Sequence, residues 1–182
     1  MAARLPGSIV PMASSKAHHA TGFAAGVMAA SIVAHSGTVG PFHVWVLLSF
    51  MAAVAGGTAP DWLEVAWWSR TRRLWITHRT VTHWGIGWIA LLAVSYHWLG
   101  HDRLAAPAFG FACGGLTHLL ADWPNPLGVP WIASRHSLNW WNSGHCDLLV
   151  VGASWTAAWF IAGHVGLHDI HGLSHLTHWL AR

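Results

Sequence analysis

Five long apolar segments alternate with short polar segments along the chain. The apolar segments cover residues 19–35, 41–57, 85–100, 104–121 and 147–166. Each is close to the roughly 20 residues that an α-helix needs to cross a bilayer. The pattern therefore predicts an all-α fold, a polytopic membrane helix bundle with about five transmembrane helices.

Two other segments predict amphipathic helices that lie in the membrane interface. Residues 62–77 mix tryptophans with arginines, a combination that suits the headgroup region. Near the C-terminus, histidines spaced by three or four residues fall on one stripe of a helix: His164, His168, His171, His175 and His178. This stripe is either the polar face of an interfacial helix or a set of histidine pairs that bind a metal or make a contact pH-dependent.

We expect a single membrane-embedded domain over residues 1–182. It would comprise an N-terminal tail (1–17), a helix bundle with loops that carry motifs (18–166) and the amphipathic C-terminal helix (167–182). Within the bundle, the glycine pairs Gly22/Gly26 and Gly110/Gly114 each place two small residues one turn apart. Such pairs allow helix backbones to approach closely in a membrane.

The composition strengthens the membrane prediction. The chain is 54% hydrophobic and only 8% charged, with a mean hydropathy of +0.41, whereas a soluble domain carries about a quarter charged residues. The net charge of +3 is small and forms no basic stripe, so nucleic acid is not an expected partner. We expect membrane lipids, and protein partners within the membrane, instead.

The basic residues predict the orientation, because Lys and Arg are enriched in cytoplasmic loops. If the N-terminus is cytoplasmic, seven of the nine basic residues lie on the cytoplasmic side: Arg4, Lys16, Arg70, Arg72, Arg73, Arg79 and Arg135. Only Arg103 and Arg182 then lie outside. The sequence thus predicts a cytoplasmic N-terminus and, after five spans, a C-terminus on the other side.

The same orientation brings a set of histidines and aspartates to one membrane face. They are His18, Asp61, His78, His83, His118 and Asp122, and they come from four chain segments. His118 and Asp122 are four residues apart, so on a helix they point the same way. Each residue alone is also explained as a helix cap or turn residue, but together they predict a site for a divalent transition metal, zinc above all, with manganese and iron as alternatives.

These residues stand in motifs that resemble those of the YdjM-like family of membrane-bound metal-dependent hydrolases. The string from His78 to His83 is similar to the HR-x-x-TH signature of that family, and the segment 114–122 to its G-x-x-x-H-x-x-x-D element. Pro60-Asp61 resembles the start of its PD-x-D motif, and residues 18–22 its H-x-x-x-G motif. The chain departs from PD-x-D at Leu63, with Glu64 one place later.

The resemblance implies a hydrolase of the bacterial inner membrane in which a metal-activated water attacks an ester, such as a phosphoester of a lipid or headgroup. Arg79 would bind a phosphate or carboxylate, or else serve as a cytoplasmic anchor. Glu64 and Asp147 are candidate general bases. The alternative is a non-catalytic membrane subunit or metal-handling protein; a haem- or pigment-binding subunit fits less well, since most of the 16 histidines lie at span ends.

Overall fold

The computed structural model describes residues 14–37, 43–68, 81–140 and 145–165. These residues form six α-helices, one 3₁₀ turn and one short pair of strands. The elements are α1 (Ser15–His35), α2 (Val44–Gly56), α3 (Ala59–Trp68), η1 (Val81–His83), α4 (Gly85–Trp98), α5 (Ala105–Asp122), β1 (Val129–Pro130), β2 (Arg135–His136) and α6 (His145–His164). The strands are antiparallel, with Val129 opposite His136.

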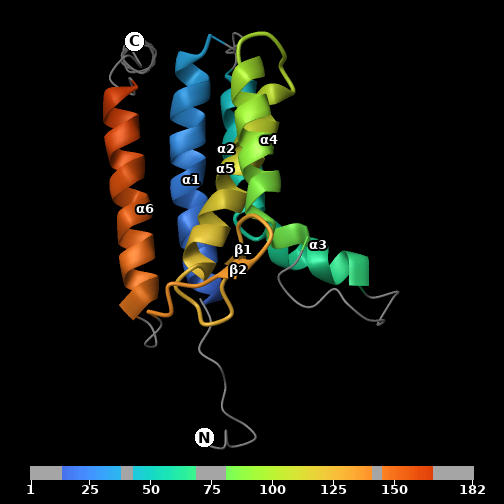
Figure 1. Cartoon of the computed structure of the whole chain (residues 1–182). Coiled ribbons are helices and arrows are strands. Elements are labelled where there is room, and N and C mark those ends of the chain that lie inside the picture. Colours follow the sequence, from blue (N-terminus) through green and yellow to red (C-terminus); the bar gives the residue numbers. More distant parts are fainter. Residues whose placement is uncertain (1–13, 38–42, 69–80, 141–144, 166–182) are drawn as a thin grey trace, which may run out of the picture.

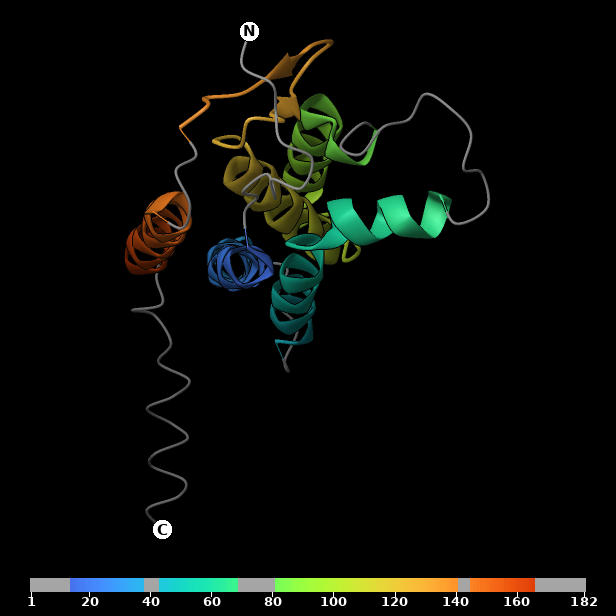
Figure 2. The same cartoon turned by 90° about the horizontal axis from the view of Figure 1, so that it is seen from below.

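Five of the helices run along one common direction, and α3 lies across it (Figure 1). α5 packs on α1, α2 and α4, so it is the central helix, whereas α6 packs mainly on α1. Seen along the bundle, α6 lies at one edge and α3 projects at the opposite edge (Figure 2). The start of α1, the α2–α3 turn, η1 and the end of α5 all meet at the same end of the bundle, and we call this the ligand end (Figure 1).

Local sequence explains where these helices begin and end. The Ser14 hydroxyl accepts a hydrogen bond of 3.2 Å from the Ala17 amide and so caps α1. α1 ends two residues before Gly37, whose φ of 75° favours glycine. α2 follows His43, a residue in the left-handed region at φ 48°. The predicted span from residue 41 is therefore observed as the 13-residue helix α2, about 20 Å long.

Small side chains fill the centre of the bundle, and large apolar ones cover its outside. The core residues of α1, α2 and α5 are mainly alanines, including Ala24, Ala25, Ala53 and Ala112, all fully buried. Large side chains point outward instead, for example Met51, Leu148, Leu149, Trp159 and Phe160. This distribution suits a bundle whose surface faces lipid, where close backbone packing replaces a large-residue core.

Within the described part of the chain, one helix, α6 over Cys146–His164, has both the length and the composition of a membrane span, and α2 is a shorter apolar helix. Each of the five predicted apolar segments nevertheless corresponds to one helix of the bundle: α1, α2, α4, α5 and α6. The predicted interfacial helix over 62–77 overlaps α3, which begins three residues earlier, and its second half lies outside the described residues. The C-terminal histidine stripe beyond His164 also lies outside them.

Glycines on α5 set how closely α2 can approach. A methyl group at Gly110 would overlap the Ser49 carbonyl oxygen, and one at Gly114 would overlap the Ala53 carbonyl oxygen. A methyl at Gly114 would also lie 2.6 Å from the Gly57 amide nitrogen. These neighbours are backbone atoms, so rotation of a side chain cannot relieve the overlap. The predicted glycine pair on α5 thus lies in a helix–helix contact.

We therefore expect Gly114→Ala to separate α2 from α5 and to destabilise the protein by about 1–3 kcal/mol, the usual cost of overpacking. Thermal unfolding followed by circular dichroism in detergent would measure the change. Gly152→Ala on α6 is the matched control, because no atom lies within 4 Å of its added methyl group. Equal unfolding temperatures for the two variants would contradict this account of the α2–α5 contact.

Candidate metal centre

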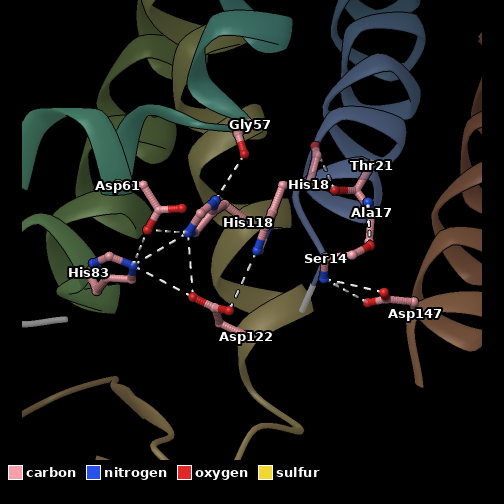
Figure 3. Close-up of polar contacts among 10 residues, drawn as sticks. All are labelled: Ser14, Ala17, His18, Thr21, Gly57, Asp61, His83, His118, Asp122 and Asp147. Carbon is pink, nitrogen blue, oxygen red and sulfur yellow. Dashed lines mark hydrogen bonds and ion pairs between the residues drawn. The ribbon is translucent and has the colours of Figure 1, made fainter. Parts of the chain in front are cut away.

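Five of the six predicted ligands meet at the ligand end of the bundle (Figure 3). His18 comes from the first turn of α1, Asp61 from the first turn of α3, His83 from η1, and His118 with Asp122 from the last turns of α5. His83, His118 and Asp122 are fully buried, and His18 is nearly so. The side chain of Asp61 is 49% exposed and forms the solvent-facing edge of the cluster.

Four of these residues face one another through single atoms at nearly equal distances. His118 Nε2 lies 3.3 Å from His83 Nε2, 3.6 Å from Asp61 Oδ1 and 3.4 Å from Asp122 Oδ2. His83 Nε2 lies 3.5 Å from each of the same two carboxylate oxygens. A charge-assisted hydrogen bond between nitrogen and oxygen is shorter, about 2.7–2.9 Å, so direct hydrogen bonds do not account for this spacing.

The spacing does match the edges of a metal coordination tetrahedron. With metal–ligand distances of about 2.0–2.2 Å, neighbouring ligand atoms of a tetrahedral zinc site are roughly 3.3–3.6 Å apart. The three distances among His83, His118 and Asp122 all fall in that interval, as expected for three donors of one ion. Imidazole nitrogen and carboxylate oxygen are also the donors that such metals use. His83, His118 and Asp122, which are buried together, could therefore hold a metal ion.

Hydrogen bonds on the far side of each imidazole orient its ring. His118 Nδ1 donates to the Gly57 carbonyl oxygen at 2.9 Å, so in the neutral ring Nε2 carries the lone pair that faces the cluster. His83 Nδ1 is 3.1 Å from the Thr82 hydroxyl. Partners of this kind fix the tautomer of metal-binding histidines. The backbone of the α2–α3 turn thus takes part in the site although none of its side chains does.

Trp88 on α4 holds the backbone of η1 in place. Its indole Nε1 donates to the Thr82 carbonyl oxygen at 2.7 Å, one residue before His83. The indole ring lies flat against Gly115 of α5, where any side chain would overlap it. Gly115 lies on α5, three residues before His118. The helix that supplies His118 and Asp122 therefore also positions Trp88, which holds the backbone next to His83.

The cluster places two carboxylates in a region with little water. Burial alone would raise the pKa of Asp61, but the close polar contacts with His118 and His83, and the positive charges of His118 and His18, outweigh it and hold that pKa well below its usual value. Ionised Asp61 therefore stabilises the metal-free fold above about pH 4, its unfolded pKa. That stabilisation is lost as the pH falls toward the lowered pKa.

The other predicted site residues have different surroundings. Glu64 is buried on α3, one turn after Asp61. Asp147 is turned toward the start of α1, where its carboxylate accepts from the Ser14 amide at 3.2 Å, and the contacts described for it do not include the cluster (Figure 3). His78 and Arg79 lie outside the described residues.

Several residues of the site did not emerge from the sequence. Gly57 acts through its backbone carbonyl oxygen. Every residue has such an acceptor, so the amino-acid type does not predict this role. Thr82 lies inside the HR-x-x-TH string, so its position next to His83 was the available signal. Trp88 is one of 15 tryptophans, and nothing in the sequence distinguishes it from the others.

Comparison with known proteins adds one finding. A family model described as the YdjM inner membrane protein matches residues 12–177, a range that includes all six predicted ligands. No curated protein and no solved structure matches the chain. The resemblance inferred from the four motifs is thus confirmed at the level of the family.

We expect the purified protein to retain a divalent transition metal, and His118→Ala to lose it, because this substitution removes the nitrogen closest to three other ligand atoms. Metal content per chain, measured by inductively coupled plasma mass spectrometry, would test this. The control is His19→Ala, a neighbouring but exposed histidine on α1. Metal-free wild type, or an unchanged metal content in His118→Ala, would refute the assignment.

Proposed function

The chain belongs to the YdjM inner membrane protein family, and from this membership and the ligand cluster we propose that it is a metal-dependent hydrolase of the bacterial inner membrane. The observation that carries the proposal is the nearly equal spacing, 3.3–3.5 Å, of three buried donor atoms from His83, His118 and Asp122. Two imidazoles with carboxylates suit zinc best, and manganese or iron would also bind such a set.

In this proposal, buried His83, His118 and Asp122 hold the metal, and half-exposed Asp61 faces the side from which a substrate arrives. A divalent metal bound there would lower the pKa of a coordinated water to about 7 and supply a nucleophile at neutral pH. Glu64, buried one turn after Asp61, is the candidate proton acceptor. Asp147 is the weaker candidate, because its carboxylate is engaged with the start of α1.

The substrate would be an ester at the cytoplasmic leaflet. Five membrane spans with a cytoplasmic N-terminus would place the ligand end of the bundle at that leaflet, in accord with the basic residues of the sequence. Trp123, directly after Asp122, and Trp140 lie at the same end and suit a membrane interface. The proposal thus puts the cluster at the depth of lipid headgroups.

An apolar pocket supports a lipid as the substrate. It has a volume of about 520 Å³ and lies among α1, α5 and α6, with Met28, Leu120, Trp123, Trp140 and Leu149 in its lining. One acyl chain suits such a lining, since the pocket offers almost no polar group. Arg79 would bind the phosphate of the headgroup in bidentate fashion.

The second candidate function is a non-catalytic metal-binding subunit. One observation favours it: His83, His118 and Asp122 are fully buried, as the ligands of a closed structural site are, whereas a catalytic site keeps one position open for water. The exposure of Asp61 favours the enzyme, because a carboxylate at the solvent edge can yield its position to a substrate. Activity measurements distinguish the two.

We expect zinc-loaded wild type, reconstituted in vesicles of phosphatidylglycerol, phosphatidylethanolamine and phosphatidic acid, to release phosphate or a phosphorylated headgroup. His83→Ala should reduce this release to the background rate, because it removes a buried donor of the cluster. ³¹P nuclear magnetic resonance of the aqueous phase would measure it.

The matched control for this assay is again His19→Ala, which should retain the full rate. Chelation should stop the release, and added zinc should restore it. Arg79→Lys should raise the KM more than it lowers kcat, since it keeps the charge but loses the bidentate geometry. Wild type that retains its metal but hydrolyses none of these lipids would support the non-catalytic alternative.

A further inference from the structure

His18 occupies a position that a single metal ion does not explain. Its Nε2 lies 3.6 Å from Oδ1 of Asp122, whereas His83 and His118 face the other oxygen, Oδ2, at 3.5 and 3.4 Å. The two oxygens of one carboxylate therefore face two separate groups of imidazole nitrogens (Figure 3). Since His18 and Asp122 are both buried, bulk water does not account for this arrangement.

The ring geometry shows which nitrogens can share an ion. The rings of His83 and His118 are inclined by 64° and their Nε2 atoms are 3.3 Å apart, so both nitrogens can reach one ion. The rings of His18 and His118 instead stack with centroids 4.0 Å apart and only 20° between their planes. Their lone pairs therefore lie in two separate, nearly parallel planes.

Two stacked imidazoles cannot both coordinate one ion well. A metal bound to His118 lies about 2.0–2.1 Å from its Nε2 and close to the plane of that ring. The metal therefore remains far from the plane of the His18 ring. The 20° inclination between the two rings brings the metal only about 1 Å closer to that plane. Two ions separated by about the spacing of the rings satisfy both histidines. That spacing, 4.0 Å, agrees with the roughly 3.5–4 Å between the ions of two-metal hydrolytic sites.

We infer that the centre binds two divalent metal ions bridged by the carboxylate of Asp122, with His18 as a ligand of the second ion. The first ion is the one of the proposed function, on which this inference rests. Asp61 borders both positions, because its Oδ1 lies 3.6 Å from Nε2 of His118 and its carboxylate lies within 4.8 Å of the ligand atom of His18. The missing second carboxylate of the PD-x-D motif, replaced by Leu63, is thus not needed for a bridge.

The second position is the open one. Among the described residues, His18 and one oxygen of Asp122 face it and half-exposed Asp61 lies beside it, so coordination sites remain for water or a substrate. Charge points to the class of ligand. Two carboxylates balance one divalent ion, and the second ion leaves an excess positive charge that a phosphate group neutralises. The pair of ions therefore favours a phosphoester over a carboxylic ester.

Metal stoichiometry tests this inference without any activity measurement. Wild type dialysed against zinc should contain two ions per chain by mass spectrometry, and His18→Ala should contain one. His19→Ala, the exposed neighbour, should keep both. With manganese, electron paramagnetic resonance should show the exchange-coupled signal of an ion pair in wild type and the signal of an isolated ion in His18→Ala. His18→Gln is the second variant, since it preserves the size and polarity of the side chain.

The outcomes separate this inference from the proposed function. Two ions in wild type and one in either His18 variant support the second site. One ion in wild type at saturation, with no coupled manganese signal, overturns it and leaves the single-metal proposal intact. No ion in either His18 variant also overturns it, because His18 would then be a ligand of the sole metal. Metal-free wild type refutes the proposed function itself.

Discussion

The whole structure depends on the need to compensate the charges of two carboxylates that lie among imidazoles inside an apolar bundle. Asp122 is fully buried at the end of α5, and Asp61 closes the same cluster from α3. A buried carboxylate without a counter-charge is strongly unfavourable. A cation shared by these side chains would remove that cost for all of them at once. The fold is best understood as the means of bringing donors from four helical segments to one point.

Small residues make that convergence possible. The ligands can meet only if α1, α2 and α5 approach closely, and glycines at the contacts allow it: Gly22 against Gly57, and Gly114 against Ala53. Gly57 has two roles, because its Cα packs on α1 while its carbonyl oxygen accepts from His118. The packing of α1 and the orientation of the His118 ring therefore both depend on Gly57. A change that separates the helices would also turn the imidazole of His118 away from the cluster.

The helices, the residues of the cluster and the family could be predicted from the sequence, because each leaves a local signature. The lengths of the apolar segments predicted the five helices of the bundle. The four-residue spacing of His118 and Asp122 predicted that both lie on the same face of a helix. The sequence could not predict the contacts that depend on how the helices pack against one another. The hydrogen bond from Trp88 to Thr82, the backbone acceptor at Gly57 and the contact of Asp147 with Ser14 all join residues whose proximity is decided by helix packing. The inclination of the histidine rings, on which the number of metals depends, is likewise a property of packing alone.

The position of α6 in the chain has a consequence for how the protein is made. All five clustered ligands lie between residues 18 and 122, whereas α6 begins at His145 and packs mainly on the outer side of α1. During synthesis, the segments that carry the ligands leave the ribosome before α6 does. The donors can therefore assemble, and a cation can enter, while the side later covered by α6 is still open to the membrane. When α6 docks, the hydrogen bond that the Ser14 amide donates to Asp147 joins its first turn to the helix that carries His18.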